Sequence, residues 1–332
     1  MITDKLGRPL RDLRISVTDR CNFRCRYCMP REEFGSDHSF LPKSELLTYE
    51  QIQSFVTACK PLGLRKVRIT GGEPLLRKDI HKLVRLLSPL GIEIALTTNG
   101  SLLSRHANNL AKSGLDRVTI SLDAIDQEVH SRITDSNVPV SDVIDGIYEA
   151  NRCDLGPVKV NCVIQRGVNE SEIPKLVNQF RGTGVIVRFI EFMDVGRTNG
   201  WTSGQVVPTS QILEFLSKEF DLIPVLRQSA SDVASRWAHS DGSGEIGFIS
   251  SISQPFCGDC VRARLSSEGK LFTCLFSTLG HDMASLIHEG VNTEELTQAI
   301  AEVWGRRSDR YSEERTQENH MLPRVEMSYI GG

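Results

Sequence analysis

The sequence lacks a long hydrophobic run, because none of its apolar stretches approaches the roughly 18 residues that a helix needs to cross a bilayer. With 39% hydrophobic and 24% charged residues, the composition is that of an ordinary globular protein. Residues 1–12 also lack the apolar core of a secretory signal and are rich in charge. We therefore expect a cytoplasmic protein without a membrane partner.

An excess of basic residues is absent as well. The 39 lysines and arginines are outnumbered by 42 aspartates and glutamates, and the formal net charge is −3. Proteins that bind nucleic acid through a broad positive field are basic, so this composition argues against that class. Local basic pockets for a small anionic ligand remain compatible with it.

Disulfide bonds are not expected, although the chain has nine cysteines. A reducing cytosol disfavours disulfides, and clustered cysteines there are more often metal ligands or catalytic groups. Six of the nine form two groups of three. The others, Cys59, Cys153 and Cys162, occupy helix and strand core positions, where we expect small buried hydrophobic residues.

The first two thirds of the chain show a repeated strand and helix pattern, which predicts a parallel sheet with right-handed crossovers. Six strands are predicted, over Leu13–Thr18, Lys66–Thr70, Glu93–Thr98, Arg117–Leu122, Val158–Ile164 and Ile186–Met193. Helices are predicted over Tyr49–Leu62, Ile80–Ser88 and Val140–Arg152, and a capping box of Thr48 and Gln51 opens the first. Six β/α units favour an α/β fold of the open kind, a partial (β/α)6 TIM-like barrel.

Polar residues occupy one face of strand after strand. Arg14, Ser16 and Thr18 alternate with apolar residues, and so do Lys66, Arg68, Thr70, Thr119, Ser121, Lys159 and Asn161. Helices cover the outer face in such a fold, so the polar face lines the barrel interior. Buried cations need counter-charges, and we therefore expect an anionic ligand inside the barrel.

The pattern ends in the segment from Gly196 to Gly204, which is rich in glycine, serine, threonine and asparagine. We therefore divide the chain into a barrel domain over 1–200 and a C-terminal lobe over 201–332. The lobe is predicted to contain a helix near Thr209–Phe220 and a strand-like piece around Ile246–Ile252. Residues 308–319 are highly charged, and we expect them to be solvated or mobile.

The first cysteine group is Cys21-x3-Cys25-x2-Cys28, directly after the first predicted strand. The active sites of β/α barrels lie at the carboxyl ends of their strands, so this location suits a catalytic centre. Three thiolates can hold three irons of a 4Fe–4S cluster and leave the fourth iron open for a cofactor or substrate. A structural zinc site is the alternative, but it normally has four ligands, and no fourth cysteine or histidine lies nearby.

This group, with Tyr27 before its last cysteine, resembles the signature of the radical S-adenosylmethionine superfamily. Gly71-Gly72-Glu73-Pro74, after the second predicted strand, is a second element similar to that family. The resemblance implies a partial (β/α)6 barrel and a reduced cluster that cleaves S-adenosylmethionine to a 5′-deoxyadenosyl radical, which then removes a substrate hydrogen. Glycine there would let a ligand approach the backbone.

The second cysteine group is Cys257-x2-Cys260-x13-Cys274. It also has three thiols and no evident fourth ligand, so a second 4Fe–4S cluster with an open iron is favoured. Zinc stays open as the alternative here too, although a zinc ribbon would need another Cys-x2-Cys pair.

The combination resembles one branch of the superfamily, which acts on GTP at the start of molybdenum cofactor biosynthesis. The resemblance is carried by both cysteine groups and by residues 13–19, 68–74, 97–100, 121–123, 158–161, 188–193, 262–264 and 331–332. It implies a lyase that removes the C3′ hydrogen of the ribose and closes a ring between C3′ and C8, giving (8S)-3′,8-cyclo-7,8-dihydroguanosine 5′-triphosphate.

The resemblance also implies a role for each matching residue. Cys21, Cys25 and Cys28 would hold the cluster that cleaves S-adenosylmethionine, and Cys257, Cys260 and Cys274 the second cluster, which binds guanine. Tyr27, Gly72, Ser121 and Met193 would surround S-adenosylmethionine. Arg14, Arg68, Thr97, Lys159, Arg262, Ala263 and Arg264 would contact GTP. Guanidinium groups suit phosphate oxygens, which supports the last set on chemical grounds.

Two assignments have alternatives. Gly331 and Gly332 are a disordered end in the simpler interpretation, whereas the resemblance implies that this tail enters the active site and assists radical initiation. Arg188 is either a phosphate contact or the partner of a carboxylate such as Glu191.

Two other functions compete with this one. A radical enzyme that modifies a peptide would usually have more C-terminal cysteines, and a protein that only transfers electrons or is stabilised by metal would not react with S-adenosylmethionine. By analogy we expect a flavodoxin or ferredoxin as reductant and transfer of the product to the next pathway enzyme, cyclic pyranopterin monophosphate synthase. A homodimer is compatible with the sequence.

Overall fold

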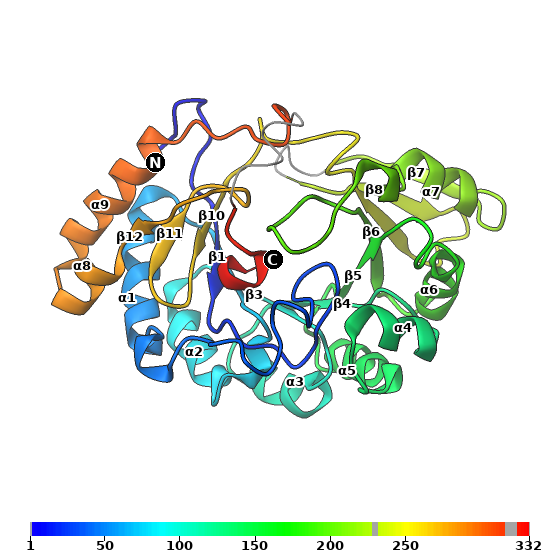
Figure 1. Cartoon of the computed structure of the whole chain (residues 1–332), viewed down its shortest axis with the longest axis horizontal. Coiled ribbons are helices and arrows are strands. Elements are labelled where there is room, and N and C mark those ends of the chain that lie inside the picture. Colours follow the sequence, from blue (N-terminus) through cyan, green and yellow to red (C-terminus); the bar gives the residue numbers. More distant parts are fainter. Residues whose placement is uncertain (1, 228–231, 316–323, 332) are drawn as a thin grey trace.

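One curved sheet organises the protein, seen in a computed structural model that describes residues 2–227, 232–315 and 324–331. Within these residues the sheet has 12 strands in the order β12-β11-β10-β1-β2-β3-β4-β5-β6-β9-β8-β7. The helices that connect the first six strands lie outside the sheet, and the short C-terminal helix lies on its inner side (Figure 1). None of the helices described is both long and apolar enough to span a bilayer.

The elements have the following bounds. The strands are β1 (Asp12–Ser16), β2 (Lys66–Thr70), β3 (Glu93–Thr98), β4 (Arg117–Ser121), β5 (Lys159–Ile164), β6 (Ile186–Glu191), β7 (Leu222–Val225), β8 (Ser235–His239), β9 (Glu245–Ile249), β10 (Arg262–Leu265), β11 (Lys270–Phe272) and β12 (His281–Asp282). The α-helices are α1 (Tyr49–Cys59), α2 (Ile80–Leu87), α3 (Leu103–Lys112), α4 (Gln127–Thr134), α5 (Val140–Arg152), α6 (Glu172–Phe180), α7 (Thr209–Leu216), α8 (Ala284–Glu289), α9 (Thr293–Arg306) and α11 (Met327–Ile330).

The six predicted strands are β1 to β6, and each pairs with the next in parallel. The predicted partial barrel is therefore confirmed. The capping box is present, with Thr48 accepting from the Gln51 amide and Gln51 from the Thr48 amide. The first helix ends at Cys59 rather than Leu62, because Pro61 has no amide hydrogen and the chain continues as a 3-10 turn over Lys60–Leu62.

The C-terminal part of the chain extends the same sheet at both of its edges. β9 pairs in parallel with β6, and β10 pairs in parallel with β1. In the residues described, the parallel part of the sheet thus contains two strands from beyond the predicted boundary at 200. The predicted helix and strand of this region are α7 and β9. The division into two domains stays a prediction.

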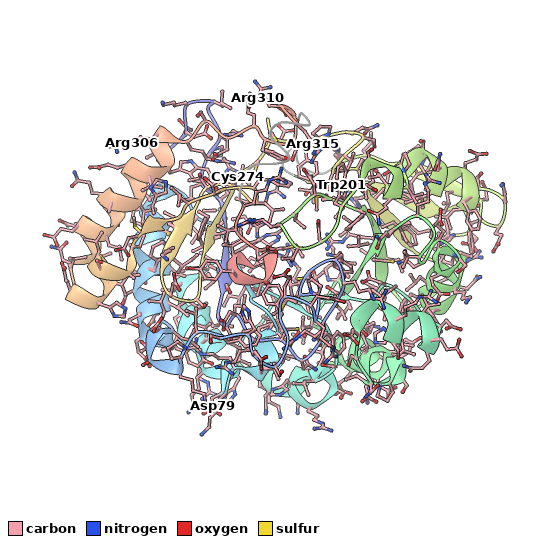
Figure 2. All side chains as sticks on the ribbon, in the orientation of Figure 1. Asp79, Trp201, Cys274, Arg306, Arg310 and Arg315 are labelled. Carbon is pink, nitrogen blue, oxygen red and sulfur yellow. The ribbon has the colours of Figure 1, made fainter. Side chains whose placement is uncertain are left out.

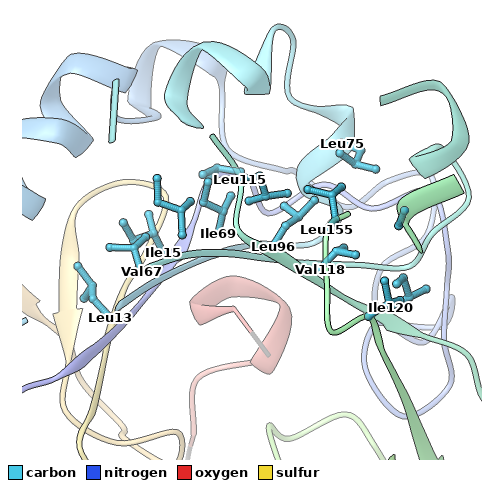
Figure 3. Packing of buried hydrophobic residues seen from close by; sticks show 14 of the residues in the cluster. Leu13, Ile15, Val67, Ile69, Leu75, Leu96, Leu115, Val118, Ile120 and Leu155 are labelled. Carbon is cyan, nitrogen blue, oxygen red and sulfur yellow. The ribbon is translucent and has the colours of Figure 1, made fainter. Parts of the chain in front are cut away.

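The hydrophobic core fills the space between the sheet and its outer helices. Leu13, Ile15, Val67 and Ile69 are fully buried and alternate with polar residues along β1 and β2. Figure 3 shows them on the helix side of the strands, with α11 on the opposite side. Each such side chain contributes about 1.5–3 kcal/mol when it is buried, which fixes the register and turns the polar residues inward.

Candidate active site

The first cysteine group lies at the carboxyl ends of the strands. β1 ends at Ser16, and the chain continues directly into the loop of Cys21, Cys25 and Cys28. Buried Phe23 anchors this loop against His130 of α4, with the two rings edge to face at 5.9 Å. The location is the one at which β/α barrels place their reactive groups.

Arg24 fixes the shape of this loop. Its guanidinium donates to the carbonyl oxygens of Cys21 at 2.8 Å, Phe23 at 2.9 Å and Phe34 at 2.7 Å. The Arg24 amide donates to the carbonyl of Thr134 at 2.8 Å, at the end of α4. The loop backbone is therefore held by the protein itself, and this preorganises the three thiols.

The Gly71-Gly72-Glu73-Pro74 segment packs directly against the loop that follows β1. The Gly72 amide donates to Thr18 O at 2.7 Å, and the Glu73 amide to Arg20 O at 2.8 Å. A Cβ on Gly71 would lie 2.5 Å from Thr18 O, and one on Gly72 would overlap the carbonyl of Arg20. Both glycines thus admit the neighbouring backbone, and the contact of this segment with a ligand stays a prediction.

Glu73 is buried and holds the next strand end in place. Its carboxylate accepts from Thr98 Oγ1 at 2.7 Å, the Asn99 amide at 2.7 Å and the Leu75 amide at 2.9 Å. Burial raises the pKa of Glu73 to about 7, although the three hydrogen bonds act to lower it. Asn99 in turn places its amide nitrogen 3.8 Å from the Sγ of Cys21, so Glu73 links two strand ends to the cysteine loop.

The donor chemistry of this loop fits a cluster. All three thiols are free, and burial raises the pKa of each, that of Cys21 to about 11. In the metal-free protein, thiols in a buried site stay protonated, and they lose their protons when metal binds. Within the described parts of the chain, no three His, Cys, Asp or Glu side chains gather around the position of a single metal ion. A 4Fe–4S cluster has a different requirement, because each thiolate binds a different iron.

The residues predicted to surround S-adenosylmethionine lie at this same end of the barrel. Gly72 follows β2, Ser121 ends β4 and Met193 follows β6. Tyr27 is in the cysteine loop, and its hydroxyl donates to Asp123 Oδ2 at 2.6 Å. They come from four separate segments and share one rim of the barrel, the arrangement expected of a binding site formed by strand ends.

The second cysteine group lies at the opposite end of the barrel. Cys257 and Cys260 precede β10, whose Arg262 is in register with Asp12 at the start of β1. Cys274 follows β11, which runs antiparallel to β10 and so ends at the same level. The two cysteine groups are therefore separated by the length of the barrel strands.

Two buried arginines shape the second loop. Arg8 donates to the carbonyl of Cys257 at 2.8 Å, and Arg307 donates to that of Cys260 at 2.8 Å. Asp4 joins them, at 2.6 Å from Arg8 Nε and 3.2 Å from Arg307 Nη1. Burial raises the pKa of Cys260, but the charges of Arg262 and Arg307 outweigh it and lower that pKa to about 6. Cys260 therefore favours the thiolate, the form that binds metal, whereas burial raises the pKa of Cys274 to about 11.

Cations fill the interior between the two cysteine groups. Arg264 is buried, and Arg14, Arg68 and Arg188 are half-buried. Loss of solvent lowers the pKa of each, and the charges of neighbouring arginines lower it further, whereas Asp12 partly offsets the effect at Arg68. Among the described residues, the Nε atoms of Arg14 and Arg68 are buried without a hydrogen-bond partner. Donors in this state fit an anionic ligand, because they would otherwise cost free energy.

The remaining residues predicted to contact GTP lie around these cations. Arg68 Nη1 donates to Thr97 Oγ1 at 3.1 Å and to Thr119 Oγ1 at 3.2 Å. Burial, and the charge of Arg188 among others, lowers the pKa of Lys159 to about 7. Ala263 is buried between Arg262 and Arg264. Ala263 thus alternates with these arginines on β10 and faces the helix side.

Arg188 faces the interior, where its Nε donates to Asn161 Oδ1 at 2.9 Å. Glu191, three residues on along β6, lies on the other face and accepts from the amides of Thr209 and Ile252. The ion pair between Arg188 and Glu191 that the sequence had allowed is therefore wrong, since residues at odd spacing on a strand point to opposite sides.

The C-terminal tail lies inside the barrel. Gly331 is buried, its carbonyl accepts from Arg264, and a Cβ on it would overlap the side chain of Thr70 in β2. The tail thus reaches one of the cations predicted to contact GTP. Gly332 lies outside the described residues.

Several residues that shape the site were missed by the sequence analysis. Glu73 and Asp123 stood within recognised motifs, so their positions gave a signal that could have been followed. Asp4, Arg8 and Arg307 gave none, because sequence spacing does not reveal that the two ends of the chain meet beside Cys257 and Cys260.

Comparison with known families agrees with the arrangement. Residues 15–180 match the family model described as Radical SAM superfamily, and residues 185–313 match the model described as Molybdenum Cofactor Synthesis C. The structure is similar to Streptococcus suis SuiB bound to S-adenosylmethionine, with a TM-score of 0.63 and 15% identity over 95% of this chain and 72% of that one. SuiB bound to its precursor peptide SuiA gives a TM-score of 0.60 at 16% identity, over 90% of this chain and 64% of SuiB. These likenesses show the fold.

The barrel with its cysteine loop defines a radical S-adenosylmethionine enzyme. Curated relatives refine this class. Proteins named GTP 3′,8-cyclase from Acidothermus cellulolyticus and Staphylococcus saprophyticus are each 48% identical to this chain, over 100% of it and 99% of their own length. The chain belongs to the GTP 3′,8-cyclase family.

Proposed function

We propose that this protein converts GTP to (8S)-3′,8-cyclo-7,8-dihydroguanosine 5′-triphosphate in the first step of molybdenum cofactor biosynthesis. The observation that carries the proposal is the set of cations that face the barrel interior between two cysteine groups at its opposite ends. Nearly full-length similarity to proteins named GTP 3′,8-cyclase supports the same substrate.

In this proposal Cys21, Cys25 and Cys28 hold the first cluster, and Tyr27, Gly72, Ser121 and Met193 bind S-adenosylmethionine. When bound, the reduced cluster and S-adenosylmethionine together supply a 5′-deoxyadenosyl radical, which takes the C3′ hydrogen of the ribose. The barrel residues orient the ribose so that C3′ can then bond to C8, and they exclude competing hydrogen donors.

We assign Cys257, Cys260 and Cys274 to a second 4Fe–4S cluster whose open iron binds the guanine ring. Two observations support this assignment. The low pKa of Cys260 favours a thiolate, and Arg262 and Arg264 lead from this group into the barrel interior. If the guanine base binds at this end of the barrel, the triphosphate can extend into the interior and contact the cations there.

Arg14, Arg68, Thr97, Lys159, Arg262, Ala263 and Arg264 form the proposed GTP site, to which Ala263 contributes only its backbone, because its side chain faces the helices. A triphosphate would supply the negative charge that the crowded guanidinium groups lack, and planar guanidinium groups suit its oxygens. Arg188 joins this set, because it faces the same interior and has its charge opposed by Arg68 and Arg117.

Gly331 and Gly332 are proposed to assist radical initiation, with Gly331 held by Arg264. We also propose a flavodoxin or ferredoxin as the electron donor and cyclic pyranopterin monophosphate synthase as the acceptor of the product. A cytoplasmic location and a homodimer complete the proposal.

The decisive experiment is an anaerobic incubation of the reconstituted protein with S-adenosylmethionine, dithionite and GTP. We expect 5′-deoxyadenosine in an amount that depends on GTP, together with the cyclised nucleotide. Replacement of GTP by a cysteine-rich peptide is the control, and 5′-deoxyadenosine that forms equally with the peptide would favour a peptide-modifying enzyme instead.

Metal analysis tests the cluster count separately. Two 4Fe–4S clusters correspond to about eight irons per chain. Cys274→Ser should lower this by about half and leave the cleavage of S-adenosylmethionine possible. Zinc bound in place of half the iron would refute the second cluster and keep the first.

A further inference from the structure

A buried charged cluster stands outside the residues assigned so far. Its centre is Asp194, which follows β6 directly after the predicted cofactor residue Met193 and whose side chain is fully buried. Asp194 accepts hydrogen bonds from the Tyr311 hydroxyl at 2.6 Å and from Arg324 Nη1 at 3.0 Å. The Nε of Arg315 donates to it at 3.1 Å.

The aromatic rings of this cluster hold the same arginines from the other side. Phe276 and Tyr311 stack at 4.3 Å between ring centroids. The guanidinium carbon of Arg324 lies 4.3 Å from the Tyr311 ring centroid, and that of Arg315 lies 5.9 Å from that of Phe276. Each arginine therefore has both a carboxylate and a ring, an arrangement that is strong when desolvated.

The four segments that meet here come from distant parts of the fold. Asp194 leaves the β6 side of the barrel, whereas Tyr311 and Arg315 come from beyond α9, which lies on the side of β1. Phe276 is two residues from Cys274, and its amide lies 3.5 Å from the Cys274 sulfur. Figure 2 shows Cys274 and Arg315 in the same region of the molecule. The cluster joins the two sides of the barrel beside the second cysteine group.

The C-terminal tail enters the barrel from this cluster. Arg324 donates to both the carbonyl and the carboxylate of Asp194. The Val325 amide donates to Ser277 O at 3.3 Å. Six residues after Val325, Gly331 meets Arg264. The position of Arg324 therefore determines where helix α11 begins, and with it the position of Gly331 in the barrel interior.

The segment after Asp194 is shaped to receive the tail. Glu326 accepts from the Arg197 amide at 3.0 Å and from Thr198 Oγ1 at 3.1 Å. Gly196 has a φ of 70°, and a Cβ on it would overlap the Glu326 carboxylate. A side chain at Gly196 would thus disturb both its own backbone and the tail.

We propose that Asp194 is a positioning residue that fixes the entry of the C-terminal tail into the barrel through Arg324 and Tyr311, and so places Gly331 beside Arg264. Its carboxylate remains ionised, because the Tyr311 hydrogen bond and the two arginines outweigh burial and lower its pKa. The location of the tail is independent of the proposed function. Only the effect of the tail on turnover rests on that function.

Hydrogen exchange measures the location of the tail without any turnover. Asp194→Asn keeps the shape of the side chain and removes the charge that holds both arginines. We expect amide exchange over residues 324–331 of the cluster-loaded protein to accelerate at least tenfold. Tyr311→Phe keeps the stacked ring, removes one hydrogen bond and should accelerate the same amides less. It also serves if Asp194→Asn folds poorly.

Glu191→Gln is the matched control. Glu191 is another fully buried carboxylate at the end of β6, but it accepts from Thr209, Ile252 and Ser253, and it has no hydrogen bond to the described residues 324–331 of the tail. Glu191→Gln should lower the overall stability of the fold. The ratio of the exchange rate of amides 324–331 to that of the amides of β1 to β6 should stay at its wild-type value. Equal acceleration of the tail in Glu191→Gln and Asp194→Asn would overturn the proposal, as would an unchanged tail in Asp194→Asn.

Turnover then separates positioning from general stability. In the full chain Asp194→Asn should lower cyclisation of GTP at least tenfold. In a chain that lacks Gly331 and Gly332 the same substitution should lower it no further, because the positioned group is already gone. A further tenfold loss in the shortened chain would show that Asp194 acts other than through the tail. If neither full-length protein cyclises GTP while the exchange result holds, the proposed function fails and the positioning of the tail stands.

Discussion

At the scale of single residues, Lys159 makes the interior sensitive to pH. Its pKa of about 7 in the free protein leaves it mostly neutral at pH 8. A bound polyphosphate favours the charged form, so binding at pH 8 should take up close to one proton, and affinity should fall as the pH rises above 7. Calorimetric titration of GTP into the protein, in buffers of different ionisation enthalpy, measures this uptake.

Lys159→Arg and Lys159→Gln provide the controls for this prediction. The arginine stays charged at pH 8, so it should bind GTP with little proton uptake and a flatter pH dependence. Glutamine should weaken binding about tenfold or more and abolish the uptake. Equal uptake by all three proteins at pH 8 would assign the proton to another group.

The sequence identified many of the residues that face the interior, because strand alternation and the cysteine spacings are local signals. It did not identify the contacts that support them. The hydrogen bond between Tyr27 and Asp123 and the ion pair between Asp4 and Arg307 join positions that are far apart in the chain. Asp194 was missed for the same reason, since its partners follow it by more than a hundred residues.

At the scale of structural elements, the close contact between the loops after β1 and β2 is open to test. Gly72→Ala would force a Cβ into the carbonyl of Arg20 and displace the start of the cysteine loop. We expect a loss of about 1–3 kcal/mol in stability and a lower iron content at the first cluster, with the second cluster retained. Iron analysis and electron paramagnetic resonance of the reduced protein provide the measurement.

Gly7→Ala is a suitable comparison, because Gly7 also lies in a loop but a Cβ there meets no atom within 4 Å. It has a positive φ of 76°, so it carries backbone strain without a steric clash. If Gly7→Ala and Gly72→Ala deplete the first cluster equally, the loss comes from general destabilisation and not from loop displacement.

The tail is a second element with a direct test. Deletion of Gly331 and Gly332 should abolish most turnover and leave normal iron content, because Gly331 lies against Arg264 and Thr70 rather than in either cysteine loop. Gly331→Ala should act in the same direction, since its Cβ would overlap Thr70. Turnover that is unchanged by the deletion, with both clusters intact, would remove the tail from the proposed chemistry.

The elements themselves were largely predictable. The strand and helix periodicity placed β2, β3 and α5 at their observed bounds, and the capping box of Thr48 and Gln51 placed the start of α1 at Tyr49. In the charged segment after α9, Ser308, Arg310 and Glu313 are exposed, but the prediction of a solvated segment is wrong at Arg315. Arg315 has only 14% of its side chain exposed, because it pairs with Asp194 and packs against the rings of Phe276 and Tyr311. Residues 316–319 lie outside the described part of the chain.

At the scale of the whole molecule, the two edges of the barrel depend on the C-terminal part. β9 pairs with the edge of β6, where the rings of Phe189 and Phe248 lie 6.0 Å apart, and β10 pairs with the edge of β1. A chain that ends at Gly200 would leave both edges bare, so we expect it to aggregate. Size-exclusion chromatography and circular dichroism would detect this, and a folded monomer would instead support an independent domain over 1–200.

The pairing of β10 with β1 also bears on how the protein is made. Arg262, the partner of Asp12 in β1, is translated 250 residues after it. At elongation rates of about 5–20 residues per second this takes roughly 12 to 50 seconds. Throughout that interval the backbone groups of β1 on this edge have no partner strand, so the barrel edge is exposed to unwanted pairing until β10 is made.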